Sequence, residues 1–214
     1  MGSKLTNMQA WDELEPAWRE AFGLAWEAFG AGTIPVGAVV TAADGSILAL
    51  GRNRIFADSA PAGQLFGTRL AHAEINALAQ LPAERRYADC TLWTTLEPCA
   101  QCIGAAWIGT IGRLVYAAAD FYGGSARMIE RELEAADNAR TFPLAVEGPL
   151  DSPLAVFSEV IWIDWFLRTF PVLHVTDAMR DRRPELVALA EGLRLRDHAS
   201  APLDEVLTLV LPEL

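Results

Sequence analysis

The sequence is poor in cysteine and in basic residues, and it lacks a long apolar run. Its 214 residues include 3 cysteines, 17 Lys and Arg, and 28 Asp and Glu, which gives a net charge of −11. No apolar run reaches the ~20 residues that a membrane-spanning helix needs. The N-terminus also lacks the charged-then-apolar pattern of an export signal. We therefore expect a cytoplasmic protein without a membrane partner.

The same scarcities argue against two further classes of protein. Three cysteines are too few for a disulfide framework. Nucleic-acid-binding proteins present clustered Lys and Arg to phosphates, whereas acidic residues outnumber basic ones here. The tight basic cluster of Arg180, Arg182 and Arg183 is interrupted by Asp181, and we interpret it as a solvated surface segment. The composition therefore argues against a nucleic-acid partner.

Two short stretches carry side chains that can bind a metal. They are His72-Ala73-Glu74 and Glu97-Pro98-Cys99-Ala100-Gln101-Cys102, and His and Cys are the usual ligands of zinc. Cys99 and Cys102 are three residues apart, so on a helix both sulfurs point to one side, and Pro98 favours a helix start at this point. His72 and Glu74 are about 200° apart on a helix. Both can serve one ion only if a helix begins beside them, so the sequence predicts two helix N-termini converging on one zinc.

The number of ligands indicates the kind of site. Structural zinc sites usually have four protein ligands, while catalytic sites have three and leave one position to water. His72, Cys99 and Cys102 make three, and Glu74 would remain to move protons. Two alternatives stay open. The Cys-x-x-Cys pair could be a redox pair, or a fourth ligand could close a structural site; the candidates for that ligand are Cys90, His174 and His198.

The pattern H-x-E followed by P-C-x-x-C is the signature of zinc deaminases, and on these residues the chain resembles the cytidine deaminase superfamily. The segments Thr91–Cys99, Ile111–Tyr116 and Ile34–Val40 are similar to bacterial tRNA adenosine deaminases and guanine deaminases. The resemblance covers roughly Ala17 to Phe170. It implies one zinc per chain and a homodimer.

The resemblance also implies roles for individual residues. Glu74 would be the catalytic proton carrier, and Asn53 would hydrogen-bond the substrate base. The backbone N–H of Ala73 and the carbonyl of Glu97 would hold the new oxygen and the amino group. The loop over residues 57–68 departs from the family by its length, and we expect it to adjoin the pocket and influence substrate choice.

The periodicity of the sequence predicts an α/β fold with three layers, in which helices cover both faces of a mixed sheet of about five strands. Helices are expected over 16–29, 70–81, 99–108, 125–139 and 158–170, and strands over 34–41, 47–51, 89–95, 113–119 and within 142–150. We expect residues 1–170 to form the zinc-dependent deaminase domain. Residues 171–214 would form a C-terminal helical extension, with helices over 185–195 and 203–211. Exposed aromatic residues on the 158–170 helix would favour an oligomer.

Together these features predict a zinc-dependent hydrolytic deaminase of a purine-type nucleobase or nucleoside, with guanine, adenine and guanosine as examples. Alternative substrates are tRNA adenosine, cytosine or cytidine, and other aminoheterocycles. A non-enzymatic zinc-stabilised interaction module is a third possibility, but such a module would not need Glu74 beside the three ligands.

Overall fold

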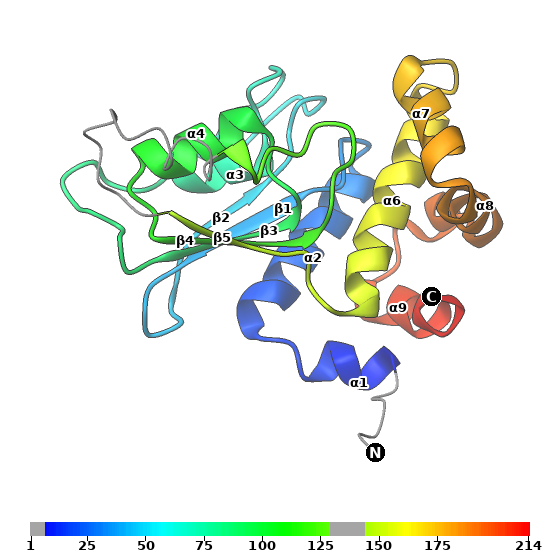
Figure 1. Cartoon of the computed structure of the whole chain (residues 1–214), viewed down its shortest axis with the longest axis horizontal. Helices are drawn as coiled ribbons and strands as arrows, with labels where there is room; N and C mark the ends of the chain where they lie inside the picture. Colours follow the sequence, from blue (N-terminus) through cyan, green and yellow to red (C-terminus); the bar gives the residue numbers. More distant parts are fainter. Residues whose placement is uncertain (1–6, 129–143) are drawn as a thin grey trace.

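The computed structural model describes residues 7–128 and 144–214, and a five-stranded mixed sheet forms its centre (Figure 1). The strand order is β2-β1-β3-β4-β5; β1 runs antiparallel to β2 and β3, while β3, β4 and β5 are parallel. The strands are β1 (Gly37–Thr41), β2 (Ile47–Arg52), β3 (Thr91–Leu96), β4 (Arg113–Ala118) and β5 (Ala145–Glu147). The predicted mixed sheet is confirmed.

Helices cover both faces of this sheet, as predicted. On one side lie α3 (Ala73–Leu78) and α4 (Ala100–Ile108), and on the other lie α2 (Pro16–Gly30) and α6 (Pro153–Thr169) (Figure 1). A short helix, α1 (Asn7–Asp12), precedes them. The zinc-motif helices α3 and α4 are therefore neighbours on one face of the sheet.

Aromatic side chains pack between α2, α6 and the sheet. The apolar side of α2 is buried, and its Phe22 and Trp26 contact Phe157 of α6, with ring centroids 6.5 and 6.3 Å apart. Trp18 meets Trp93 of β3 edge-on at 5.3 Å. Pro16 at the first helical turn and the glycine-containing segment after Phe29 set the ends of α2 as the sequence predicts.

Strand β2 lies very close to α3. A Cβ atom at Gly51 would lie 2.3 Å from the Ala73 carbonyl oxygen and 2.4 Å from the Ala77 nitrogen. Such distances are shorter than any non-bonded contact, so only glycine allows the strand to touch the helix backbone. This contact fixes the beginning of α3 against the sheet.

The C-terminal extension consists of α7 (His174–Arg182), α8 (Pro184–Leu193) and α9 (Leu203–Val210), with short 3₁₀ turns at Leu195–His198 and Leu211–Glu213. The sequence predicts α8 and α9 but misses α7. Its arginines, interpreted above as a solvated segment, lie at the end of that helix, while Val175 and Met179 are buried beneath it.

The extension folds back onto its own chain. Trp26 donates its indole N–H to the Ala201 carbonyl at 2.8 Å, and Trp11 donates to Asp204 Oδ1 at 3.0 Å. The boundary at residue 170 stays a prediction. The argument for an oligomer from exposed aromatic residues is wrong, because Trp162 and Trp165 are only 4% and 2% exposed. The homodimer itself stays a prediction.

The two motif helices are shorter than predicted: α3 spans Ala73–Leu78 instead of 70–81, and α4 begins at Ala100 instead of 99. The predicted 125–139 helix falls largely on residues 129–143, which lie outside the described residues. Among the helices of the described residues, none is long and apolar enough to cross a membrane.

Candidate metal centre and substrate pocket

Two helix N-termini converge at the predicted metal site. His72 is the residue that precedes α3, and Cys99 is the residue that precedes α4; both have extended backbone conformations. Because Cys99 lies before the helix, only Cys102 lies within α4, in its first turn. The prediction of converging helix ends is confirmed. The partial positive charge at both ends favours thiolates at this point.

The ligand atoms fit a tetrahedral zinc. His72 Nδ1 lies 3.6 Å from Cys99 Sγ and 3.5 Å from Cys102 Sγ, and the two sulfurs are 3.7 Å apart. In a tetrahedral site with ordinary Zn–S and Zn–N bond lengths, two sulfurs are about 3.8 Å apart and a sulfur and a nitrogen about 3.5 Å apart. The three side chains are thus spaced to hold one zinc ion.

The metal ligands are strongly coupled in protonation. A hydrogen bond from Cys102, with a further one from His72, lowers the pKa of Cys99 to about 4. The pKa of Cys102 is raised by the hydrogen bond with Cys99 and by burial. A hydrogen bond to Cys99 raises the pKa of His72, and a second one to the Arg69 backbone acts in the same direction. A backbone partner of this kind orients a metal-binding imidazole.

Glu74 lies beside the three ligands without joining them. It occupies the first turn of α3, is 4% exposed, and accepts a hydrogen bond from the Thr94 hydroxyl at 3.3 Å. Burial raises the pKa of its carboxyl group. A carboxyl group held in this way can carry a proton at the edge of a metal site.

Asn53 faces the same pocket with its amide orientation fixed. Its Oδ1 accepts the Thr33 hydroxyl at 2.8 Å and the Ile55 backbone N–H at 3.1 Å. A backbone N–H needs an acceptor, so this contact identifies the oxygen of the amide. Within the described residues, Asn53 Nδ2 makes no hydrogen bond and is left to donate to a ligand.

In the sequence, Ala73 directly follows the ligand His72, and Glu97 lies two residues before the ligand Cys99. Ala73 is the first residue of α3, where backbone N–H groups have no partner inside the helix. Glu97 has a function that the sequence does not predict. Its carboxylate accepts the backbone N–H groups of Asp120 at 3.2 Å and Ala126 at 3.1 Å. It thereby anchors the loop that follows β4.

A pocket of about 180 Å³ opens onto this centre. Of the candidate site residues, Asn53, His72, Glu74, Glu97 and Cys99 line it. Further walls, which the sequence does not predict, come from the loop after β4 and from α6: Asp120, Tyr122, Gly123, Trp162 and Phe166. The residue 57–68 loop contributes no lining residue to this pocket. The loop instead contacts α3, where the Leu65 backbone N–H donates to Asn76 Oδ1 at 2.7 Å.

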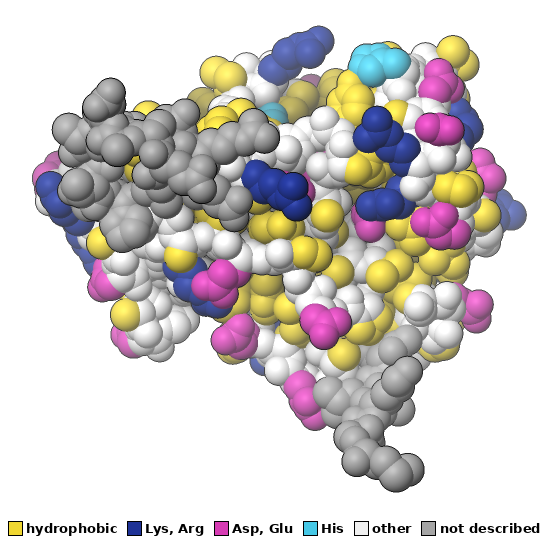
Figure 2. Space-filling view, in the orientation of Figure 1, with side chains coloured by type: hydrophobic (Ala, Val, Ile, Leu, Met, Phe, Trp, Pro, Cys, Tyr) yellow, Lys and Arg dark blue, Asp and Glu magenta, His cyan; other side chains and the backbone are white. Residues whose placement is uncertain are grey.

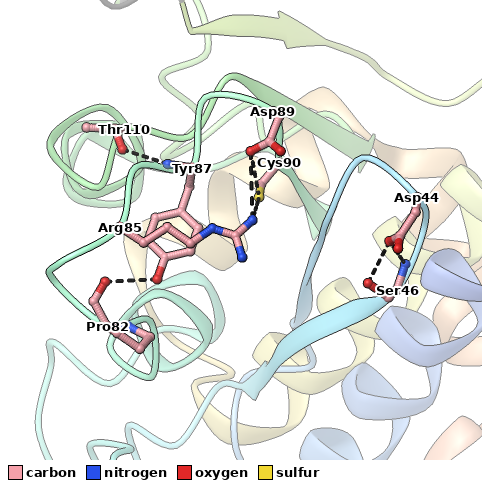
Figure 3. A network of polar contacts seen from close by, with 8 residues as sticks. All are labelled: Asp44, Ser46, Pro82, Arg85, Tyr87, Asp89, Cys90 and Thr110. Carbon is pink, nitrogen blue, oxygen red and sulfur yellow. Dashed lines mark hydrogen bonds and ion pairs between the residues drawn. The ribbon is translucent and has the colours of Figure 1, made fainter.

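The candidate fourth ligands lie elsewhere. Figure 3 shows Cys90 with Arg85 and Asp89: the thiol lies 3.5 Å from Asp89 Oδ1 and 3.8 Å from an Arg85 nitrogen. His174 contacts Tyr122. Among the described residues, the cluster of side chains that could hold a metal ion comprises His72, Cys99 and Cys102. A closed site with four protein ligands is therefore not formed by these residues.

Comparison with known proteins identifies relatives over the zinc-site half of the chain. The family model for the cytidine and deoxycytidylate deaminase zinc-binding region matches residues 12–118. The tRNA(Ile)-lysidine synthase of Deinococcus radiodurans is 42% identical over 117 residues, which are 53% of this chain and 19% of that protein. The chain spans about a fifth of the length of this relative and of its Deinococcus deserti counterpart.

Other relatives are covered more fully. The guanine deaminase of Bacillus subtilis is 32% identical over 58% of this chain and 80% of its own length. The cytosine deaminase of Candida albicans is 33% identical over 53% of this chain and 73% of its own length. A solved structure from studies of A-to-I editing by tRNA:A34 deaminases is 26% identical, with a TM-score of 0.53, and covers 66% of this chain and 97% of that chain.

Proposed function

Because the chain belongs to the cytidine and deoxycytidylate deaminase zinc-binding family, we propose that it releases ammonia hydrolytically from a purine-type base, free or as a nucleoside. The observation that carries this proposal is the buried Glu74 carboxyl group in one pocket with His72 and Cys99. A redox pair or a structural zinc site has no use for such a carboxyl group. A proton-transfer reaction needs one.

The size and walls of the pocket support a planar heterocycle as the substrate. Its volume of about 180 Å³ is below the roughly 300–1,000 Å³ of sites for drug-sized ligands, so one base fits and a sugar would extend outward. Trp162 and Phe166 supply aromatic surface on which a base can pack. Asn53 Nδ2 can donate to a ring nitrogen or a carbonyl oxygen of the base.

The side chains around the pocket divide the chemistry between them. Zinc bound by His72, Cys99 and Cys102 would supply an activated water by lowering its pKa. Glu74 then takes a proton from the attacking water and passes it to the ring nitrogen; it next takes the proton of the new hydroxyl group and passes it to the amino group, which leaves as ammonia. The backbone N–H of Ala73 and the carbonyl of Glu97 can hold the new oxygen and the amino group.

The second candidate is editing of adenosine in tRNA. It is favoured by the likeness to the tRNA:A34 deaminase structure. The net charge of −11 weighs against it, and in Figure 2 the basic side chains lie scattered among acidic and apolar ones. Binding to tRNA, measured as a function of salt, separates the two. An editor binds at moderate salt, and its affinity falls steeply as salt rises.

The test of the leading proposal is ammonia release from guanine, adenine, guanosine, cytosine, a pterin and a triazine. Glu74→Gln is the matched blank, because glutamine keeps the shape and the acceptor for Thr94 but cannot carry the proton. We expect turnover of a purine-type compound, one zinc per chain in both proteins, and a loss of turnover by about 10²-fold or more in Glu74→Gln. Near-normal turnover in Glu74→Gln would contradict the role of Glu74. No ammonia from any compound would contradict the proposal and favour tRNA or a non-enzymatic module.

A further inference from the structure

The C-terminal extension reaches the mouth of the pocket at one point. The hydroxyl of Tyr122 is hydrogen-bonded to Nε2 of His174, the first residue of α7, and their ring centroids are 5.6 Å apart. Tyr122 lines the pocket, whereas His174 does not. The contact therefore joins the wall of the pocket to a segment 52 residues further along the chain.

The backbone around Tyr122 is fixed from within the domain. The Asp120 carboxylate accepts the N–H groups of Tyr122 at 2.8 Å and Gly123 at 3.0 Å. The Glu97 carboxylate in turn accepts the backbone N–H of Asp120. Gly124 forms an isolated β-bridge with Cys99. The loop is thus rigid at its base, next to a zinc ligand. None of these backbone bonds determines which way the Tyr122 ring points.

The Tyr122 side chain depends on the extension for its orientation. It is 49% exposed, so packing within the domain restrains it weakly. His174, in contrast, is held on a firmly anchored helix. Its neighbours Val175 and Thr176 are 1% and 0% exposed, and the Thr176 hydroxyl donates to the Leu173 carbonyl at 2.7 Å. The backbone of His174 is thus placed by the buried residues that follow it, and from there its imidazole reaches the phenol of Tyr122.

The bond between the two side chains contributes modestly to the stability of the fold, because both of them are exposed. Its position at the pocket mouth also gives it a consequence for ligand binding. A tyrosine ring that is held in one rotamer loses no further freedom when a ligand packs against it.

We infer that His174 is a positioning residue that holds the Tyr122 ring as the outer wall of the substrate pocket, so that the C-terminal extension contributes to affinity for the aminoheterocycle. This inference rests on the proposed function. Substrate does not touch His174 in this arrangement. Removing the hydrogen bond leaves Glu74 and the zinc ligands in place, so it weakens substrate binding and leaves the chemical step intact.

The test compares His174→Phe, Tyr122→Phe and the double variant, all in the full-length zinc-loaded protein. His174→Gln restores an acceptor for the phenol, and His198→Phe is the matched control in the same extension. The substrate is whichever compound of the panel the wild-type protein turns over best. Zinc content and thermal melting are measured for each variant to verify folding.

We expect His174→Phe and Tyr122→Phe each to raise KM by about 3- to 10-fold, the worth of one hydrogen bond, with kcat changed less than about twofold. The double variant should be no worse than either single variant, because both remove the same bond. His174→Gln should recover most of the affinity, and His198→Phe should behave as wild type.

Three outcomes would overturn the inference: an unchanged KM in His174→Phe, effects that multiply in the double variant, or a fall in kcat without a rise in KM. These are distinct from failure of the proposed function. If the wild-type protein deaminates nothing in the panel, that function falls, and the inference falls with it. If the wild type is active and His174→Phe matches it, only the inference is lost.

Discussion

The hydroxyl of Thr33 lies 2.8 Å from Oδ1 of Asn53, and both side chains are buried. The same hydroxyl is 3.4 Å from the Phe56 backbone nitrogen. It therefore accepts the Phe56 N–H and donates its own proton to Asn53 Oδ1. This bond helps to direct the nitrogen of the Asn53 amide to the pocket. Thr33 thus helps to orient the Asn53 amide, which we propose to contact the substrate, although Thr33 does not line the pocket itself.

Thr33→Val should weaken substrate binding. Valine keeps the shape but removes the hydroxyl, so only the Ile55 backbone N–H still holds the Asn53 amide in the orientation that presents its nitrogen to the pocket. We expect KM to rise by about 3- to 10-fold, the range of one hydrogen bond, with zinc content unchanged. Thr41→Val is the matched control, because Thr41 is a buried threonine that accepts the Trp93 indole N–H at 2.9 Å away from the pocket. Equal kinetic constants for the two variants would remove the positioning role of Thr33.

Zinc content should separate the three cysteines. Cys99→Ala and Cys102→Ala each remove one of three ligands, and we expect both to retain much less than one zinc per chain after dialysis and to lose activity. Cys90→Ala should keep one zinc, because its thiol lies in the network with Arg85 and Asp89. The measurement is metal analysis by mass spectrometry. Full zinc occupancy in Cys99→Ala would contradict the ligand set.

Gly51→Ala should destabilise the protein through the start of α3. The added methyl would overlap the backbone of Ala73 and Ala77, and the helix that follows His72 would have to move. Overpacking of this kind costs about 1–3 kcal/mol or more, and we also expect weaker zinc retention. The control is Gly23→Ala in α2, where a Cβ meets nothing within 4 Å. That change should stabilise the helix by ~0.5–1 kcal/mol. Urea unfolding of both variants measures the difference, and similar stabilities would contradict the close approach of β2 to α3.

The metal centre could be predicted from the sequence because its information is local. His72 and Glu74 are two residues apart, so they cannot share one face of a regular helix. Cys99 and Cys102 are three residues apart, so they can. The strands and the two layers of helices follow from periodicity in the same way. The ends of the helices are less exact: α3 ends at Leu78 and α6 begins at Pro153, and a residue that precedes a helix looks like a residue of its first turn in sequence.

The walls of the pocket could not be predicted, because distant segments build them. Tyr122 comes from a loop after β4, Trp162 and Phe166 come from α6, and His174 comes from the extension. Helix α7 was missed because its charged residues obscure a short apolar pattern. The signal was present in Val175 and Met179, four residues apart and buried. The burial of the α6 aromatic residues likewise depends on tertiary packing, which periodicity does not reveal.

The burial of Asp164 predicts that the stability of the protein depends on pH through a group outside the metal site. It is 2% exposed, its Oδ1 accepts from Arg168 Nε at 2.8 Å, and its Oδ2 has no hydrogen-bond partner among the described residues. Burial raises the pKa of this carboxyl group, although the pairing with Arg168 opposes the shift. The folded protein therefore binds the proton more readily than the unfolded chain does.

The sign of the effect follows from proton linkage. Where the folded state holds more protons, the free energy of unfolding falls as pH rises. The contribution of Asp164 is thus fully present below the unfolded pKa of about 4, and it is lost as pH rises through the higher folded pKa. Asp164→Asn lacks this titration and keeps an acceptor for Arg168. We expect its stability relative to wild type to increase between pH 4 and pH 7, measured by urea unfolding at low protein concentration. Asp177→Asn, in an exposed pair with Arg180 at 3.7 Å, controls for the change in net charge. A relative stability of Asp164→Asn that stays constant or falls with pH would show that the ion pair with Arg168 outweighs burial.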